Sequence, residues 1–331
     1  MNRRLKRLAP ALGAMLVGVY FAGTSQAATA GTDRAHQDWR AAIARTATPA
    51  KGCFTASYPL LLWRQVACVT APNIPYVPRS GSRGGRTVGD GDDYAAVSQK
   101  FTSAATGSFP VVKGLKTEND NGRPNVYSIQ LNSNFMSNDT ACANAFDPSK
   151  CLGWEQFVYS SSSREVFIQY WLIFYTGGTV HCPAGWNSYS QDCYRNSQAV
   201  SAPQEKITDL SSMTLGGIAV KKGIDTLTFA DGANAYSTTG EDTVMYLAYG
   251  WNGSEFNIIG DGGGSEATFN AGTKLTVRID LVDGSIAKPT CEANAGTTGE
   301  TNNLNLGACK ALKGSGTTIL PAVQFVESLA K

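Results

Sequence analysis

Short strand-like runs separated by glycine-rich turns are the feature that most constrains the fold of this 331-residue chain. From residue 126 onward, runs such as VYSIQLNSNF, GWEQFVYSS, EVFIQYWLIFY and TVMYLAYGW follow one another with little helical periodicity. Such runs are typical of β-strands, and about two hundred residues of them favour two packed sheets. We therefore predict an all-β fold over residues 113–331, a two-sheet antiparallel β-sandwich of the jelly-roll or concanavalin-like kind.

A glutamine lies in the middle of EVFIQYWLIF, the most apolar of these runs. Because alternate residues of a strand face opposite sides, Phe167, Gln169 and Trp171 share one face. Both faces are apolar, which predicts an interior strand, where an unpaired amide is costly to bury. Two interpretations stay open. Gln169 faces a functional cleft, or it bonds to backbone or to a cross-strand residue such as Gln130 or Gln156.

The first 30 residues have the organisation of an export signal. Four basic residues precede an apolar run at 9–22, and TSQAATA offers small residues for cleavage after Ala27 or Ala30. We predict a signal peptide over 1–30 and a secreted or periplasmic protein. No later run is apolar enough to span a bilayer. Subtracting the four basic residues from the formal net charge of +2 leaves −2, which does not suggest a nucleic-acid partner.

The eight cysteines all follow the signal, and they form neighbouring couples along the chain. In an oxidising compartment this pattern predicts four local disulfides. The spacing disfavours a metal site, since CxxC is absent and His181 is the only histidine beyond the N-terminal segment. We predict neither a metal nor a cofactor. The predicted disulfides are Cys53–Cys68, Cys142–Cys151, Cys182–Cys193 and Cys291–Cys309.

Residues 31–112 differ in composition from the rest of the chain. We expect one helix over residues 31–47, then a disulfide-closed module containing Cys53 and Cys68. The stretch APNIPYVPRSGSRGGRTVGDGDD that follows is rich in Pro, Gly, Arg and Ser, which predicts an exposed linker. Exposed basic linkers are preferred sites of proteolytic processing. We therefore expect an N-terminal prosegment that ends between Arg79 and Val112.

Several kinds of catalysis are disfavoured by the residues present. A serine triad needs a histidine base, but the sandwich offers only His181 and has no GxSxG turn. Paired cysteines cannot act as nucleophiles, and no dinucleotide fingerprint or P-loop occurs. The acidic loops GDGDD and GDGGGSE contain oxygen ligands suited to calcium. We favour the alternative interpretation, that both loops are tight turns in which glycine adopts a positive φ.

Two further stretches resemble the eqolisins, the family of glutamic peptidases. GWEQFVYSSSSREVFIQYW is similar to the family's W-V-G-I-D-G strand followed by A-I-L-Q-T-G. Trp154 matches the tryptophan of the first strand, and Gln169 matches the catalytic glutamine of the second. GSEFNIIGD resembles the A-E-W/F-I-x-E strand that carries the catalytic carboxylate. The resemblance covers roughly residues 126–265.

This resemblance implies an exported, acid-active endopeptidase with a propeptide. In the family a glutamate activates the attacking water and the glutamine amide stabilises the oxyanion, two roles that suit these residue types. Glu255 matches the first of two glutamates on the family strand, whereas the second falls on Ile259. Asp261 lies two residues beyond, on the same face by parity. The predicted site is therefore catalytic Gln169 with Glu255 or Asp261, and substrate-binding Trp154 and Trp171.

Two other functions remain open from the sequence. The sandwich could be a carbohydrate-binding, lectin-like module, with the tryptophans of GWNGSEFN and CPAGWNSYSQDC stacking on sugar rings. It could also be a structural secreted protein that kept the fold and lost the site. The expected partner is accordingly a polypeptide substrate or a glycan.

Overall fold

The computed structural model describes residues 24–79, 84–137, 140–316 and 319–330. The chain forms two compact units, Met1–Ala35 and His36–Lys331. Helix α1 (Thr24–Ile43) includes most of the helix expected over residues 31–47 and begins seven residues earlier. The predicted signal peptide lies outside the described residues as far as residue 23. Cleavage after Ala27 or Ala30 therefore stays a prediction.

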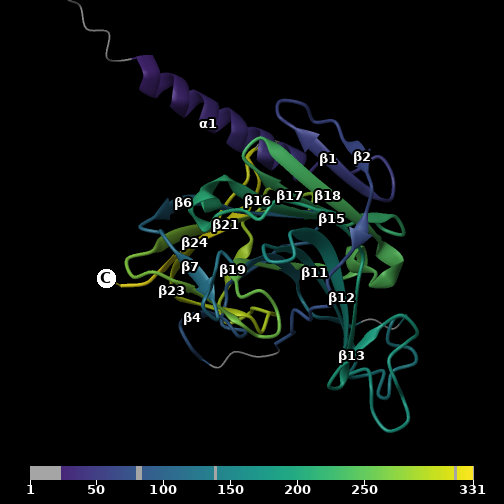
Figure 1. Cartoon of the computed structure of the whole chain (residues 1–331). Coiled ribbons are helices and arrows are strands. Elements are labelled where there is room, and N and C mark those ends of the chain that lie inside the picture. Colours follow the sequence, from purple (N-terminus) through teal and green to yellow (C-terminus); the bar gives the residue numbers. More distant parts are fainter. Residues whose placement is uncertain (1–23, 80–83, 138–139, 317–318, 331) are drawn as a thin grey trace, which may run out of the picture. The chain divides into compact units, whose positions relative to one another are not determined.

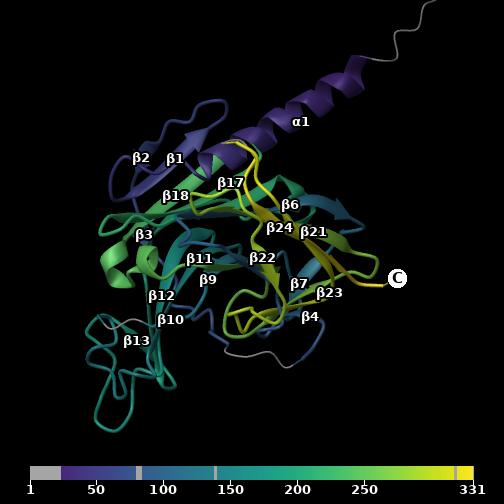
Figure 2. The same ribbon diagram turned by 180° about the vertical axis from the view of Figure 1, so that it is seen from behind.

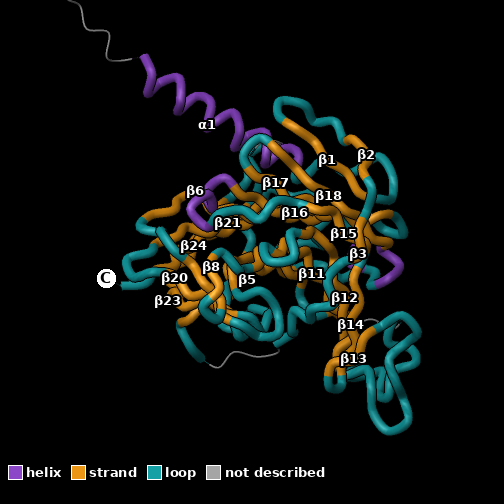
Figure 3. Tube along the Cα trace, in the orientation of Figure 1, coloured by secondary structure: helices purple, strands orange, loops and turns teal. Residues whose placement is uncertain are grey.

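The second unit is a β-sandwich, as predicted. Strands make up 48% of the chain and helices 8%, and the strands form two large sheets that do not close into a barrel. Figure 1 shows β16, β17 and β18 in one layer and β11 and β12 in the other, and Figure 3 shows how strand dominates this unit. The strand pairs are antiparallel except for β20 with β23, which is parallel.

The larger sheet has thirteen strands. Its C-terminal strands β23 and β24 are seen from behind in Figure 2. In spatial order it contains β2 (Arg64–Val66), β1 (Cys53–Ser57), β18 (Asn234–Glu241), β17 (Ile224–Asp231), β16 (Met213–Ile218), β6 (Ala104–Lys113), β21 (Lys274–Val282), β24 (Ala322–Ser328), β23 (Thr301–Leu312), β20 (Glu266–Phe269), β7 (Glu118–Asp120) and β8 (Arg123–Pro124), with β4 (Thr87–Gly89) beside β23.

The smaller sheet has eleven strands. Short 3₁₀ turns η1 (Ile207–Ser212), η2 (Asp242–Val244) and η3 (Leu247–Tyr249) lie in the connections between strands. In spatial order the sheet contains β13 (Asn187–Tyr189), β14 (Asp192–Asn196), β12 (Glu165–Ile173), β11 (Leu152–Ser160), β9 (Ser128–Ser133), β19 (Gly253–Ile259), β5 (Ala95–Val97) and β22 (Thr290–Glu292), with β10 (Met136–Ser137) beside β11, β15 (Gln198–Ser201) beside β12, and β3 (Val69–Thr70) beside β15.

Strands β11 and β12 have one face toward the sandwich core and one away from it. Their core-facing side chains, such as Tyr159 and Ile168, are buried in the main apolar cluster, and the Tyr159 ring stacks on Phe229 of the other sheet with centroids 3.9 Å apart. The register pairs Gln156 with Gln169 on the opposite face. The period-two pattern thus places Gln169 outside the sandwich core, as the strand alternation requires.

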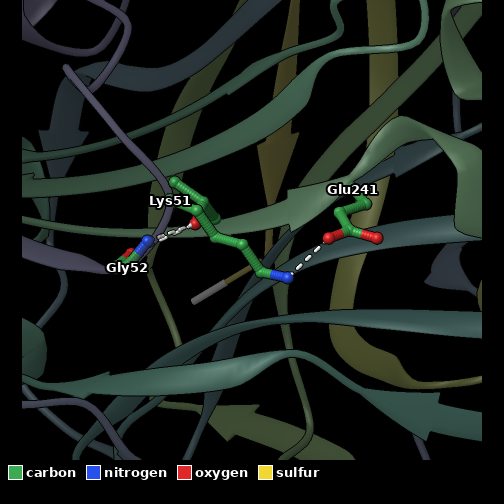
Figure 4. A network of polar contacts seen from close by, with 4 residues as sticks. Lys51, Gly52 and Glu241 are labelled. Carbon is green, nitrogen blue, oxygen red and sulfur yellow. Dashed lines mark hydrogen bonds and ion pairs between the residues drawn. The ribbon is translucent and has the colours of Figure 1, made fainter.

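Segments before residue 113 already belong to the sheets. Strand β6 lies in the middle of the larger sheet between β16 and β21, so the sandwich includes residues N-terminal to the predicted start. Strand β1 pairs with β18. Figure 4 shows the entry to this pair, where Lys51 Nζ lies 2.6 Å from Glu241 Oε1 and the Gly52 amide donates to Thr239 Oγ1 at 2.8 Å.

All eight cysteines are paired, and the four pairs are the predicted ones. Local disulfides of this number are typical of proteins that fold in an oxidising compartment such as the extracellular space or the periplasm. Within the described residues, no helix has the length and apolar character needed to cross a bilayer.

Candidate functional site

Residues 72–79, here called the strap, run across the face of the smaller sheet that carries Gln169. Their sequence, PNIPYVPR, has a proline at every third position, which holds the backbone extended and leaves its carbonyls free to accept hydrogen bonds. The prediction of an exposed linker is wrong for this part, because Tyr76 is fully buried. Apolar side chains at Ile74, Tyr76 and Val77 outweigh the Pro-rich character of the stretch.

Gln169 binds the strap through both ends of its amide. Its Oε1 accepts from the Tyr76 backbone N–H at 2.7 Å, and its Nε2 donates to the Ile74 carbonyl at 2.9 Å. The remaining hydrogen-bonding positions go to Trp171 Nε1 at 2.9 Å and Asn196 Oδ1 at 2.8 Å. Gln169 is 0% exposed, so the strap completes the burial and the hydrogen bonding of this amide.

Glu300 holds the next backbone amide of the strap. Its Oε1 accepts from the Val77 N–H at 2.9 Å and from the Gly264 N–H at 3.1 Å, and its Oε2 is 2.6 Å from Thr298 Oγ1. The sequence reasoning missed Glu300, which directly precedes β23 in a glycine-rich stretch. One sequence pattern could have pointed to Glu300. The alternation of TNNLNL predicts a strand, and Glu300 directly precedes the first residue of that strand.

Carbonyl groups of the strap are hydrogen-bonded as well as its amides. Asn196 Nδ2 donates to the Pro72 carbonyl at 2.7 Å, and the Gly263 N–H donates to the Pro75 carbonyl, also at 2.7 Å. Beyond Val77, the strap forms an antiparallel bridge between Pro78 and Thr298. Residues 72–79 are therefore bound mainly through their backbone, in the way an extended peptide adds to a sheet.

A chain of side-chain hydrogen bonds connects Gln169 to Glu300 beneath the strap. Trp171 Nε1 is shared between Gln169 Oε1 and Gln156 Oε1, the latter at 3.1 Å. Gln156 Nε2 donates to Gln130 Oε1 at 3.0 Å, and Thr298 Oγ1 lies 3.2 Å from that same oxygen. Buried polar networks fix side-chain positions when every member is bonded, so Gln169 and Glu300 belong to one preorganised polar surface.

The predicted substrate-binding residues Trp154 and Trp171 are both fully buried. Their rings lie 6.3 Å apart, and Val77 of the strap packs against the apolar cluster that contains them. In the full chain the two indoles therefore form an apolar floor beneath the strap.

Asp261 also reaches the strap, through a side chain. The Tyr76 hydroxyl donates to Asp261 Oδ1 at 2.8 Å, and the ring packs on Phe167 with centroids 5.8 Å apart. Asp261 Oδ2 accepts from the Ser162 backbone N–H at 3.3 Å and from the Ser162 hydroxyl. The structure thus brings Asp261 to the same strap residue that Gln169 holds.

Glu255 is placed differently. Its Oε2 accepts from the Thr297 N–H at 2.8 Å, from the Thr298 N–H at 3.2 Å and from Asn132 Nδ2 at 3.2 Å. Glu255 is 2% exposed, so it is a buried carboxyl group of β19 and not a solvated strand residue. None of these bonds involves the strap, and Glu255 instead fixes the loop that leads to Glu300.

Burial raises the pKa values of the carboxyl groups around the strap. It raises the pKa of Glu300 to about 7, against the opposing hydrogen bonds from Thr298 and from the Val77 and Gly264 amides. Burial also raises the pKa of Asp261, with hydrogen bonds from Ser162 and Tyr76 acting the other way. Desolvation penalises the charged carboxylate. Because the strap contributes to the burial, these raised pKa values apply to the site while the strap covers it.

Carboxylates of both acidic glycine loops bind protein groups. Within the described residues, no group of three or more His, Cys, Asp or Glu side chains converges as metal ligands would. In GDGDD, Asp93 is fully buried and accepts from the Gly89 N–H at 2.9 Å, while Asp90 has a φ of 52° and contacts Arg79 at 3.3 Å. In GDGGGSE, Asp261 accepts the hydrogen bond from the Tyr76 hydroxyl.

The two tryptophans considered for stacking on sugar rings, Trp251 and Trp186, differ in their exposure to solvent. Trp251 of GWNGSEFN is fully buried and packs on Phe157 in the sandwich core, so this ring cannot stack on a ligand at the surface. Trp186 of CPAGWNSYSQDC is partly exposed and lies against Arg195, whose guanidinium carbon is 5.1 Å from the ring centroid. Glycan binding stays a prediction.

The comparisons with known proteins give one distant match. The chain is similar to Scytalido-glutamic peptidase, an eqolisin, in a crystal structure with a peptide-based transition state analog; identity is 12% and the TM-score 0.28, over 75% of this chain and 99% of that one. No family model and no curated protein matches the chain. A likeness of this size carries no argument about activity, which has to be argued from the residues at the strap.

Proposed function

We propose that this protein is an exported, acid-active peptidase in which Gln169 and a carboxylate act on an extended polypeptide, and that the strap occupies the substrate position in the full chain. The observation that carries the proposal is the binding of the strap. Gln169 Nε2 donates to a backbone carbonyl of the strap, and consecutive amides of Tyr76 and Val77 donate to Gln169 and Glu300. A surface that binds a peptide in this way can bind another.

Among the candidate carboxylates, Glu300 fits the catalytic role best. It shares the strap backbone with Gln169, whereas Asp261 touches only the Tyr76 hydroxyl and Glu255 does not bond to the strap. In the proposed reaction Glu300 takes a proton from water as the water oxygen bonds to the carbonyl carbon. The Gln169 N–H stabilises the resulting oxyanion. The proton then passes to the departing nitrogen as the C–N bond breaks.

The pKa of Glu300 links the strap to the working pH. While the strap covers it, burial holds this pKa at about 7, so the group is protonated in acid and cannot act as a base. Uncovering removes desolvation and returns the pKa toward the ordinary value of about 4.3. Glu300 therefore binds a proton when the strap covers it. By linkage, the titration of Glu300 makes low pH favour the state in which the strap is bound. Activation then requires cleavage of the chain rather than low pH alone.

The test is proteolysis of a denatured protein substrate at about pH 4, near the ordinary glutamate pKa, using the full chain after an added protease has cut it C-terminal to the strap. Gln169→Ala should lower kcat by about 100-fold, the typical loss of one oxyanion donor. Glu300→Gln should abolish turnover, whereas Glu255→Gln serves as the matched carboxylate control and should leave kcat within a few-fold. N-terminal sequencing should place the new terminus between Arg79 and Thr87, because β4, β5 and β6 beyond that point are paired within the two sheets. Turnover that survives in both Gln169→Ala and Glu300→Gln would contradict the proposal.

A further inference from the structure

The Tyr76 side chain occupies a defined subsite beside Gln169. Its ring lies in an apolar cluster with Val158, Phe167 and Ala199, and no part of Tyr76 is exposed. Its hydroxyl donates to Asp261 Oδ1 at 2.8 Å. The Ser160 side chain also hydrogen-bonds to Tyr76. Apolar walls with a small number of placed polar groups are the arrangement by which proteins select one side chain over its near analogues.

We propose that this subsite selects the tyrosyl side chain of extended polypeptides, and that Asp261 is the residue that distinguishes tyrosine from phenylalanine. The selection deepens the proposed function, because it names the substrate class for the same surface. The strap is then the tyrosine-bearing segment that fills the subsite before processing.

Asp261 is held as a fixed acceptor for a hydroxyl. Its Oδ2 is engaged by the backbone and the hydroxyl of Ser162, and its Oδ1 accepts from the phenol. The Ser160 side chain also hydrogen-bonds to Asp261 and to Tyr76. Asp120 Oδ2 accepts from the Asp261 backbone N–H at 3.0 Å and holds this end of the loop. Asp261 is 6% exposed, so an occupant without a hydroxyl leaves Oδ1 with little access to water. Unpaired buried acceptors are costly, and sites built to bond a hydroxyl reject its deoxy analogue.

The contacts of the strap backbone do not carry this selection. Any residue with an N–H at position 76 can donate to Gln169 Oε1, and any residue at position 74 offers a carbonyl to Gln169 Nε2. Peptide addition of this kind takes affinity from the main chain and specificity from side-chain subsites. Val77 contributes only apolar packing near Trp154 and Trp171, so the tyrosine hydroxyl is the one polar side-chain group of residues 74–77.

The first experiment measures binding in trans. The full chain with Tyr76→Ala, whose strap has lost its anchor, is titrated with labelled peptides PNIPYVPR and PNIPFVPR and followed by fluorescence anisotropy. The tyrosine peptide should bind about 10- to 100-fold more tightly than the phenylalanine peptide, the range expected for leaving one buried acceptor unpaired. Adding Asp261→Ala should reduce the preference to less than threefold. Equal affinities in the Tyr76→Ala chain, or no binding of either peptide, would overturn the proposal.

The second experiment uses the full chain with a minimal change. Tyr76→Phe should increase hydrogen exchange at the Tyr76 and Val77 amides by about tenfold or more, since the strap opens more often. Tyr194→Phe is the matched control. It also removes a tyrosine hydroxyl that donates to the strap, to Asn73 Oδ1 at 2.9 Å, but Asn73 is exposed to solvent. The control should change exchange by less than threefold. Unchanged exchange in Tyr76→Phe would overturn the subsite.

Hydrolysis distinguishes failure of the subsite from failure of the peptidase. The chain cut C-terminal to the strap is given paired peptides that differ only by Tyr or Phe, and kcat/KM should favour Tyr by about tenfold or more. If no peptide is cut while the trans preference holds, the peptidase proposal falls and the tyrosine subsite stands as a binding site. If both peptides are cut equally, the selection by Asp261 is refuted and the peptidase stands.

Discussion

Replacing Glu327 by glutamine should remove a large part of the pH dependence of folding stability. Glu327 lies on β24, is fully buried, and accepts from Asn257 Nδ2 at 2.7 Å. Burial raises the pKa of this carboxyl from 4.5 to about 8, against hydrogen bonds from Asn257 and Asn302. Glutamine has nearly the same shape and stays neutral, so it imitates the protonated acid at every pH.

The sign and size of the effect follow from linkage. Because the folded pKa lies above the unfolded one, the contribution of Glu327 is fully present below about pH 4.5 and is lost as the pH rises to about 8. Raising the pKa from 4.5 to about 8 corresponds to about 5 kcal/mol of folding free energy, at about 1.4 kcal/mol for each tenfold change in proton affinity. Solvent entry and local relaxation reduce this figure, so we expect a loss of about 3 to 5 kcal/mol across that window.

Urea unfolding with the disulfides intact, at several pH values between about 4 and 8.5, measures the effect. At the acid end, the free energy of unfolding of Glu327→Gln should lie within about 1 kcal/mol of the parent value. At the alkaline end, the variant should be more stable than the parent by several kcal/mol. Glu241→Gln is the control. Its exposed carboxylate is paired with Lys51, which lowers its pKa, so it should not share this gain at high pH. A difference between Glu327→Gln and the parent that is the same at pH 4 and pH 8 would refute the reasoning.

Two further changes test how the strap and Gln169 are held. Gly262→Ala should loosen the strap, because Gly262 has a φ of +90° and an added Cβ would lie 2.4 Å from Ile74 Cγ2; faster limited proteolysis within residues 72–79 should report this. Gly263→Ala has comparable backbone strain at a φ of +66° but no atom within 4 Å, and proteolysis of the strap should stay closer to the parent rate. Trp171→Phe removes the N–H shared by Gln156 and Gln169, and should lower kcat about tenfold with little change in KM if Gln169 is catalytic, since a less fixed donor stabilises the oxyanion less. A change confined to KM would instead place Trp171 in binding.

The sequence was sufficient for several features that depend on local pattern, although the strand-like run TVMYLAYGW contains the 3₁₀ turn η3 and no strand. Period-two alternation identified β11 and β12 and put Gln169 on one face with Phe167 and Trp171, although both faces are apolar and the pattern did not show which one meets the core. The spacing of the cysteines identified every disulfide. Glu300 and the strap could not be found in this way. Their relation to Gln169 depends on contacts between residues 93 and 223 positions apart in the chain. No local pattern in a proline-rich stretch shows which sheet face it will cover.

The position of Gln169 in an apolar strand follows from what covers each face. The core-facing side of β12 packs on the other sheet, where a side-chain amide would have no partner. The other side meets the strap, whose backbone supplies one donor from Tyr76 and one acceptor from Ile74. Without the strap, Gln169 keeps Trp171 on its oxygen and Asn196 on its nitrogen. That leaves one acceptor position and one N–H, the pair that the amide and carbonyl of an incoming peptide can satisfy. The hydrogen bonds that stabilise the covered chain are thus the same ones that would bind and polarise a substrate.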